Sequence, residues 1–307
     1  MKSFRRTLLQ AFALSPLALN LSLPALAQNS LTTTAIDDKL TLISGAGVNV
    51  VVAVGPESVV VVDGGLAENA DALLAQIDAI AAGKPIAALF NTNWRPDKCG
   101  LNQALAARGV PIIAHENTRL WQNAEFYSEW LDLEHTPMPK EMQANQTFYD
   151  KGTLTLGDET IEYGWISQAA TDGDIYVHFK KSDVLVVGDM VGNGAYPLLD
   201  YVTGGWIGGA QKAVRGLIEL SSDSTKIVAS QGGPVNKAHL EKQAAMLDHA
   251  YEKVAEAFKT GRSLKEFKAA DPMQPFNAEW GDPDLFLALL YKGTWYHIPG
   301  RAVQGII

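Results

Sequence analysis

The feature that most constrains this chain is a polar ten-residue segment placed directly after a short apolar run. Residues 86–90 are apolar and predict a buried strand, and residues 91–100 then read Asn-Thr-Asn-Trp-Arg-Pro-Asp-Lys-Cys-Gly. Arg cannot donate a lone pair to a metal, and Lys is normally protonated. The fold must therefore present a group of amide and charged side chains, rather than a set of metal ligands, where this buried strand ends.

The pattern around this segment predicts an α+β chain. β-Rich runs at 40–43, 49–54 and 59–63 are separated by glycine-containing turns, and apolar residues at helical spacing follow over 66–80. Strands followed by helices, repeated in two halves, favour a four-layer αββα sandwich, although the pattern alone also fits other α/β folds. Further strands are expected at 111–114, 153–156, 160–164, 175–179, 184–187 and 226–229, and helices at 101–108, 118–134, 210–220 and 238–258.

The first 27 residues have the composition of a secretory signal peptide. Three basic residues precede a largely apolar run, and Ala25-Leu26-Ala27 fits a small-x-small cleavage site. We expect residues 1–27 to be removed on export to the periplasm or the medium, by the Sec route or, because Arg5-Arg6 loosely fits a twin-arginine motif, by the Tat route. The apolar run is too short for a confident membrane span, and the mature chain is expected to have none.

Charge and cysteine content narrow the possible partners. The chain has 307 residues, 47% of them hydrophobic, which suits one large domain with a sizeable core. Loss of the three cations of residues 1–27 would change the formal net charge from −9 to −12, which argues against nucleic acid as a partner. Cys99 is the only cysteine, so no disulfide can form within the chain.

Residues 91–100 resemble the Asn-Thr-His-x-His-x-Asp-His-x-Gly segment of the metallo-β-lactamase superfamily. The resemblance continues through Val-Val-Asp63-Gly-Gly, Thr171-Asp-Gly-Asp174, Val184-Leu-Val-Val-Gly-Asp189 and Ile227-Val-Ala-Ser-Gln231-Gly. It covers about residues 38–292, and it implies a domain over 28–292, a C-terminal tail over 293–307 and the αββα sandwich as the fold. In that family, three histidines and the aspartate of this segment take part in a dinuclear zinc site.

The metal-ligand positions that the resemblance implies have mostly lost their donors. All five histidines of the family are replaced here, whereas its two aspartates correspond to Asp97 and Asp189. Zinc sites are built from imidazole, thiolate and carboxylate ligands. We therefore expect no zinc and no other cofactor at these degenerate positions, which are Asn93, Arg95, Asp97, Lys98, Ala170, Asp189 and Gln231.

The replacements suggest that charge is compensated. Two neighbouring carboxylates without metal repel each other and lose hydration. We expect Arg95 and Lys98 to occupy the metal volume and to form ion pairs with Asp97 and Asp189. The oxygen donors of Asn93, Asp97, Asp189 and Gln231 leave Ca²⁺ or Mg²⁺ as an alternative, which the two adjacent cations disfavour.

Other candidate site residues have ordinary structural interpretations. A neighbouring cation such as Lys98 would favour a nucleophilic Cys99 thiolate, but Cys99 is better explained as a small side chain at a helix start. His115 ends a predicted strand near the cleft and is a candidate for a polar role there. The resemblance implies that Trp121, Tyr196 and Asp200 border the cleft, and packing of the 118–134 segment in the core is the alternative for Trp121.

These observations favour an exported metallo-β-lactamase-fold pseudoenzyme that binds a small molecule or another exported protein. The alternative is a metal-independent or weakly metal-dependent hydrolase of an ester, lactone or thioester, in which Arg95 and Lys98 act as electrophiles and Asp97 or Cys99 as base or nucleophile. A structural subunit that partners an intact paralogue is a third possibility. The sequence names no ligand and no oligomeric state.

Overall fold

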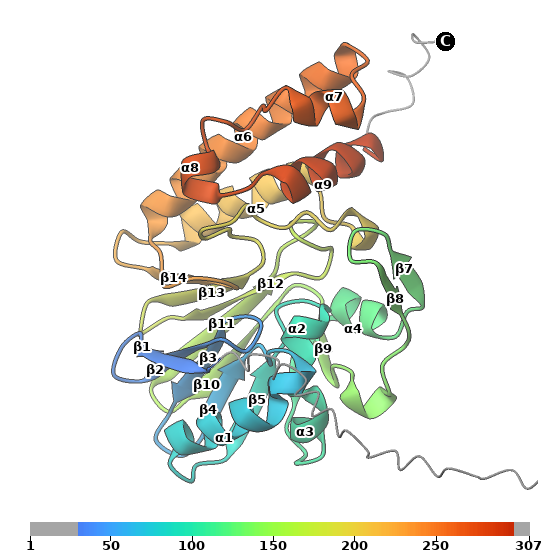
Figure 1. Ribbon diagram of the computed structural model, residues 1–307. Coiled ribbons are helices and arrows are strands. Elements are labelled where there is room, and N and C mark those ends of the chain that lie inside the picture. Colours follow the sequence, from blue (N-terminus) through green and yellow to red (C-terminus); the bar gives the residue numbers. More distant parts are fainter. Residues whose placement is uncertain (1–29, 298–307) are drawn as a thin grey trace, which may run out of the picture. The chain divides into compact units, whose positions relative to one another are not determined.

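A seven-stranded mixed sheet forms one half of the computed structural model, which describes residues 30–297 (Figure 1). The strands at the start of the chain pair antiparallel as hairpins, and β4, β5, β6 and β9 pair parallel. In spatial order the strands are β1 (Thr32–Ala35), β2 (Leu40–Ser44), β3 (Val50–Val54), β4 (Val59–Val62), β5 (Ile86–Phe90), β6 (Ile112–His115) and β9 (Gln146–Phe148).

A five-stranded sheet forms the other half. Its first four strands follow one another as antiparallel neighbours, whereas the last two pair parallel. In spatial order these strands are β10 (Lys151–Leu156), β11 (Glu159–Trp165), β12 (Ile175–Phe179), β13 (Val184–Gly188) and β14 (Lys226–Ala229).

Apolar residues that alternate along each strand build the core between the two sheets. In β4, Val60 and Val62 face the inter-sheet core, while Val59 and Val61 face the other side of the sheet. All four are fully buried because both faces of this strand are covered. Side chains from the second sheet, among them Phe179, complete the same inter-sheet core.

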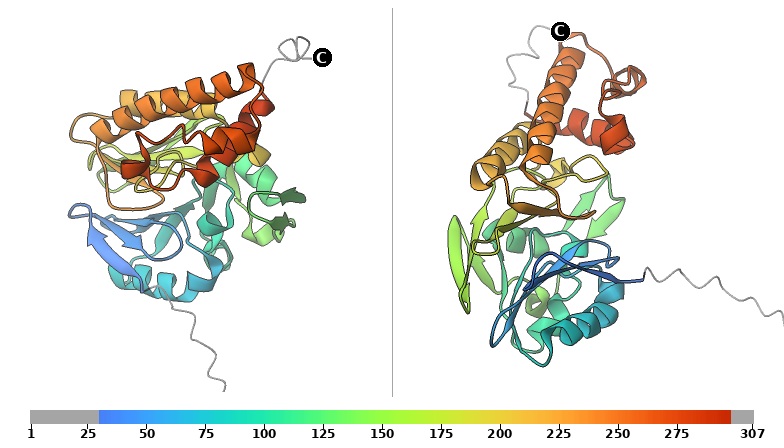
Figure 2. Two further views of the ribbon diagram at one scale, coloured as in Figure 1. Left: turned by 45° about the horizontal axis from the view of Figure 1, so that its top comes forward. Right: turned by 90° about the vertical axis from the view of Figure 1, so that its left-hand side faces the viewer.

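Helices cover the two outer faces. Helices α1 (Ala70–Ala81) and α3 (Asn102–Ala106) pack on the seven-stranded sheet through residues such as Leu73, Ile77 and Leu105. Helices α5 (Ile207–Leu220), α6 (Lys237–Lys259) and α9 (Asp284–Trp295) cover the five-stranded sheet (Figure 2). The described residues therefore form the helix–sheet–sheet–helix sandwich that the sequence predicted. The short helices η1 (Ala67–Asn69), α7 (Leu264–Ala269) and α8 (Asn277–Trp280) complete these layers.

The predicted helix over residues 118–134 is wrong beyond its first turns. Helix α4 (Glu116–Gln122) ends at Asn123, and the chain then forms a hairpin of β7 (Phe126–Ser128) and β8 (Leu133–His135). The aromatic spacing that suggested a helix serves the hairpin instead, because Phe126 stacks on His135 at 4.8 Å and packs edge-on against Trp94 at 5.1 Å. Aromatic residues suit a strand as well as a helix, so their spacing was a poor discriminator.

Some sequence predictions concern the two ends of the chain, which the described residues cover only in part. Residues 1–27, the expected signal peptide, and residues 298–307 of the expected tail lie outside the described part of the chain. Within it, α9 continues to Trp295, across the expected domain boundary at residue 292. The exposed strand β1 and the short strand β9, neither expected as a strand, extend the first sheet at its two edges. Across residues 30–297 no helix has both the length and the apolarity that a membrane span requires.

Candidate functional site

The candidate site lies where parallel strands of both sheets end. Asp63 directly follows β4, the segment 91–100 follows β5, Asp189 directly follows β13 and Ser230 directly follows β14. Parallel strands bring their carboxyl ends to one edge of a sheet, which is where open α/β sheets place their ligand sites. The segment after β5 turns into the short helix α2 (Pro96–Cys99), whose first residue is a proline with its φ already suited to a helix.

Four charged side chains meet at this edge as the sequence predicted. The Nη2 atom of Arg95 lies 2.8 Å from Oδ2 of Asp97, and its Nε lies 3.5 Å from Oδ2 of Asp189. The Nζ atom of Lys98 lies 3.1 Å from Oδ1 of Asp189 and 3.7 Å from Oδ1 of Asp97. Each cation therefore contacts both carboxylates, and we call these four residues the ion-pair cluster.

The ion-pair cluster is shielded from water. The side chain of Lys98 is fully buried, and those of Asp189, Arg95 and Asp97 are 11%, 16% and 16% exposed. Burial by itself lowers the pKa of Lys98, but the carboxylates of Asp189 and Asp97 raise it above its usual range. Burial likewise raises the pKa of Asp189, and Lys98 and Arg95 more than reverse that effect and hold it well below its usual range. All of Lys98, Arg95 and Asp189 are charged at neutral pH.

Two neutral side chains complete the contacts of the cluster. The Nδ2 group of Asn93 donates to Oδ2 of Asp189 at 3.0 Å and to Oδ1 of Asp174 at 3.2 Å. Its Oδ1 accepts from the backbone N–H of Arg95 at 3.1 Å. The ammonium of Lys98 donates to Oγ of Ser230 at 2.7 Å. Ser230 therefore joins the last strand of the second sheet to the segment that follows β5.

Two further carboxyl groups lie behind the cluster, at Asp63 and Asp174. Asp63 accepts hydrogen bonds from the backbone N–H and hydroxyl of Thr92, at 2.8 and 2.9 Å. Asp174 accepts from the backbone N–H of Thr171 at 2.6 Å. Burial is the main influence on both groups and raises the pKa of each to about 7. These hydrogen bonds act in the opposite direction, as does the charge of Lys98 on Asp63.

The hairpin β7–β8 supplies an aromatic cover. The guanidinium carbon of Arg95 lies 5.5 Å from the ring centroid of Trp130, within reach of a cation–π contact. Trp130 in turn donates from Nε1 to Oδ1 of Asp200 at 2.7 Å, and Thr203 donates to the second oxygen of Asp200 at 2.6 Å. Asp200, expected at the cleft border, is thus a buried acceptor that holds the covering tryptophan.

Cys99 is a buried side chain at the end of α2, rather than at the start of a helix as expected from the sequence. Its thiol is buried and lies 3.6 Å from the carbonyl oxygen of Trp94, and the Nε2 group of Gln122 lies 3.3 Å from the sulfur. Burial raises the pKa of Cys99 to about 12, far more than the charge of Lys98 lowers it. At neutral pH the group is a thiol, which makes it a poor nucleophile.

The other expected residues lie outside the ion-pair cluster. Gln231 donates to the carbonyl oxygen of Gly47 at 2.8 Å, and the buried Ala170 contributes its carbonyl oxygen to the backbone N–H of Asp200 at 2.8 Å. His115 caps α4 by accepting from the backbone N–H of Asn117 at 3.2 Å. Both nitrogens of this imidazole are engaged, because Nε2 lies 3.1 Å from the carbonyl oxygen of Tyr149.

The remaining two cleft candidates pack against neighbouring elements. Trp121 donates from Nε1 to Oδ1 of Asp172 at 2.6 Å, next to the loop that carries Asp174. Tyr196 stacks on Phe286 at 4.7 Å, and its hydroxyl donates to Oδ1 of Asn277 at 2.8 Å. Trp121 thus fixes a loop beside the site, whereas Tyr196 belongs to the packing of the helical layer.

Sequence reasoning missed the contacts of Ser230, Asp63 and Asp174 with the cluster and its surroundings. Each of the three directly follows or precedes a buried strand, as Asn91 does. A search for polar residues at the ends of apolar runs would have found them, because the ends of neighbouring strands converge. No pattern in the sequence shows that Ser230, rather than the adjacent Gln231, contacts Lys98.

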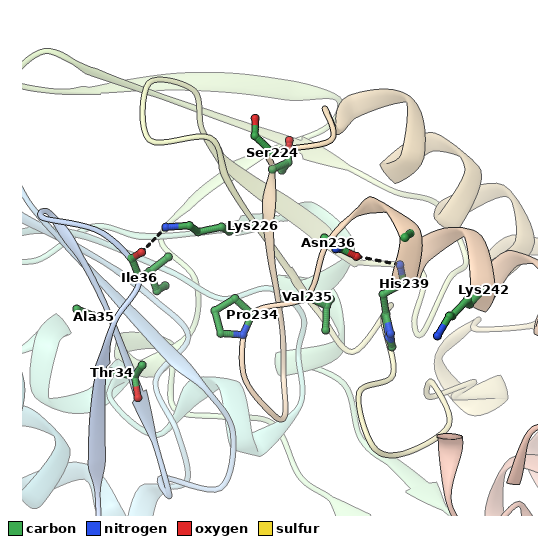
Figure 3. A pocket seen from close by; sticks show the side chains of 12 residues that line it. Thr34, Ala35, Ile36, Ser224, Lys226, Pro234, Val235, Asn236, His239 and Lys242 are labelled. Atoms are coloured by element: carbon green, nitrogen blue, oxygen red, sulfur yellow. Dashed lines mark hydrogen bonds between the residues drawn. The ribbon is translucent and has the colours of Figure 1, made fainter. Parts of the chain in front are cut away.

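A cavity of about 700 Å³ lies apart from the cluster, between β1, the start of β14 and the start of α6. Its lining includes Lys226, whose ammonium donates to the carbonyl oxygen of Ile36, and Asn236, whose side chain caps α6 by accepting from the backbone N–H of His239 (Figure 3). None of the residues that line this cavity belongs to the ion-pair cluster.

The sequence profile of the metallo-beta-lactamase superfamily matches residues 43–236, more than half of the chain. The chain belongs to this superfamily. The matched range contains all four residues of the ion-pair cluster and both sheets from β3 to β14. A search of curated proteins found no match to the chain.

Solved structures share the superfamily fold at low sequence identity. A metallo-beta-lactamase from Pontibacter korlensis is 20% identical, with a TM-score of 0.59 over 71% of this chain and 99% of that chain. The DIM-1 metallo-beta-lactamase is 18% identical, with a TM-score of 0.57 over 72% of this chain and 98% of that chain. The inverting sec-alkylsulfatase Pisa1 from Pseudomonas sp. is 17% identical, with a TM-score of 0.58 over 79% of this chain and 45% of that chain.

The side chains at the positions that the resemblance assigns to metal ligands do not fit a zinc centre. Zinc needs lone-pair donors, whereas the protonated Lys98 and Arg95 present N–H groups and positive charge toward Asp97 and Asp189. Across residues 30–297, no three or more His, Cys, Asp and Glu side chains are grouped as metal ligands would be. A dication would have to displace Lys98 from its contacts with Asp189 and Ser230 to bind Asp189, and Arg95 from its contact with Asp97 to bind Asp97.

Proposed function

We propose that this chain is an exported, non-catalytic member of the metallo-beta-lactamase superfamily that binds a small molecule or another exported protein. The observation that carries the proposal is the contact of Lys98 with both Asp97 and Asp189, at 3.7 and 3.1 Å. In working members of the family those carboxylates would hold metal. Here each is neutralised by side-chain cations, so neither is available to bind and activate a water molecule.

The chemistry of the individual groups supports a binding role. Lys98 is held protonated by the carboxylates around it, so it cannot accept a proton. Cys99 is a buried thiol, and Asp97 is engaged by Arg95 at 2.8 Å. None of these three side chains is therefore free to act as a base that would generate a nucleophile at neutral pH.

One contact favours the alternative, a metal-independent hydrolase. The 2.7 Å contact between Lys98 Nζ and Ser230 Oγ is the geometry of a hydroxyl nucleophile beside an amine base. The protonated state of Lys98 opposes this role, because an ammonium donates to the hydroxyl instead of taking its proton. Activity would require a substrate that separates Lys98 from Asp189.

A turnover screen separates the two functions. Purified protein is assayed with ester, lactone and thioester substrates, with added zinc and then with a chelator, beside Ser230→Ala and Asp97→Asn variants. We expect wild type to show no more turnover than either variant under both conditions. Zinc-dependent turnover would overturn the proposal, and metal-independent turnover that Ser230→Ala abolishes would establish the hydrolase. A partner that copurifies in stable stoichiometry, with no turnover, would favour a structural subunit.

A further inference from the structure

A cavity of about 380 Å³ lies beside the hairpin β7–β8, and tyrosines dominate its lining. Tyr127 comes from β7, Tyr201 from the short helix η3 (Tyr201–Thr203), and Tyr296 follows α9. Glu129 and Val202 complete the lining. We call this cavity the tyrosine pocket; its volume is in the range that accepts small organic ligands.

Two of the three tyrosines that line the tyrosine pocket use their hydroxyl groups in hydrogen bonds within the protein. The hydroxyl of Tyr201 donates to Oε2 of Glu129 at 3.0 Å, and that of Tyr127 donates to Oδ1 of Asp132 at 2.8 Å. The rings of Tyr201 and Tyr296 are nearly parallel, at 18°, with centroids 5.9 Å apart. Tyr127 and Tyr296 are 54% and 73% exposed, so a ligand from solvent can reach them.

The charge around the tyrosine pocket is negative. Glu129 lines it, Asp132 contacts the Tyr127 hydroxyl, and Glu134 lies close enough to help raise the pKa of that phenol. Lys292 offsets part of this negative charge, because its Nζ lies 2.7 Å from the other oxygen of Glu129. The whole chain carries a formal charge of −9, which adds to the attraction for a cation.

We propose that the tyrosine pocket binds a small organic cation that carries a quaternary ammonium group. Such a group has no N–H to satisfy and is attracted to the negative faces of aromatic rings. A sugar or a primary ammonium would need several hydrogen-bond partners, and two polar groups of the lining, the Tyr201 hydroxyl and the Glu129 carboxylate, already bond within the protein. The pocket shares no residue with the ion-pair cluster, so this inference is independent of the function proposed above.

Isothermal titration with choline and its neutral isostere 3,3-dimethylbutan-1-ol tests the proposal, because the two differ chiefly in charge. We expect choline to bind and the isostere to bind at least about tenfold more weakly. Tyr296→Ala should weaken choline binding about two- to thirtyfold, the range of a cation–π contact. Tyr296→Phe keeps the ring and should bind as wild type does, and Glu129→Gln should weaken binding while still accepting from the Tyr201 hydroxyl.

Tyr251→Ala is the matched control, because Tyr251 is an exposed tyrosine on α6, away from the pocket lining. It should leave choline binding unchanged. Absence of choline binding at millimolar concentrations would overturn the proposal. So would equal affinity for the isostere, or choline binding that neither Tyr296→Ala nor Glu129→Gln weakens. Circular dichroism confirms that each variant is folded.

Discussion

The ion pairs that follow β5 and those around Asp158 both join lysine to aspartate, but the first are buried and the second are exposed to water. Lys98 and Asp189 are fully and largely buried, with their charged atoms 3.1 Å apart. Asp158 is 56% exposed and contacts both Lys39, at 2.6 Å, and Lys181. The surface contacts are at least as short, yet water already solvates those charges and screens their attraction. Burial, rather than distance, decides which of these lysines the fold depends on.

The comparison is tested most strongly at Lys98. Replacing it by methionine keeps an apolar stem but leaves Asp189 buried without its ammonium partner. We expect Lys98→Met to lower the free energy of unfolding by about 3–5 kcal/mol, measured by urea denaturation. A Lys98→Met/Asp189→Asn double variant removes the orphaned charge as well and should recover part of the loss. Unchanged stability in Lys98→Met would show that the ion-pair cluster contributes nothing.

The next largest expected effect on the unfolding free energy comes from the protonation of Asp174. Its pKa is 3.8 in the unfolded chain and about 7 when folded, because burial disfavours the charged form. Between these values the folded protein holds a proton that the unfolded chain has released, so stability must fall as pH rises. We expect the unfolding free energy to drop by about 2–3 kcal/mol from pH 5 to pH 7 through this group. Asp174→Asn should reduce the slope and leave the part that Asp63 contributes, because the pKa of Asp63 is also raised to about 7. An identical slope in the variant would contradict the assignment.

Replacing Arg95 should lower the unfolding free energy less than replacing Lys98 does. Its side chain is 16% exposed, so water partly replaces what the variant loses. Arg95→Met removes the hydrogen bond to Asp97 and the contact with Trp130, and we expect a loss of about 1.5 kcal/mol. Arg95→Lys should not restore full stability, because an ammonium cannot reach Asp97 and Asp189 through two separate nitrogens as the guanidinium does. Thermal melts of both variants provide the measurement.

The smallest effect is expected at Asp158. Hydrogen bonds from Lys181 and Lys39 hold the pKa of Asp158 below its usual range, but more than half of the side chain is exposed to solvent. Asp158→Asn should leave the urea midpoint unchanged within error, at low salt and at high salt. A loss as large as that of Lys98→Met would mean that burial is not what separates the two regions.

Much of the fold was predictable because the strand patterns are strong. The apolar runs of β4 and β5 and the helical spacing of α1 appear where the sequence placed them, within one or two residues at most ends and four at the start of α1. The hairpin β7–β8 was not predictable, because its aromatic residues fit either secondary structure until the positions of Trp94 and His135 are known. Tertiary packing decided that segment.

The sequence predicted which charged residues of the candidate site pair with each other, but it did not predict all of the site's contacts. The family resemblance implied that Asp97 and Asp189 lie together, and side-chain type then indicated that Arg95 and Lys98 neutralise them. The distances agree. The role of Ser230 depends on which residue of its loop faces Lys98. The types of the residues in a loop do not determine its conformation, so this contact could not be predicted. The raised pKa values of Asp63 and Asp174 depend on burial by both sheets, which only the folded chain provides.

The central claim is that side-chain cations occupy the volume in which the superfamily binds metal. Crystals grown with excess zinc, with anomalous diffraction recorded at the zinc edge, test it directly. We predict no anomalous peak between Asp97 and Asp189, and continuous density for Lys98 reaching Asp189 and Ser230. A well-occupied peak between the two carboxylates, with Lys98 displaced, would contradict the account.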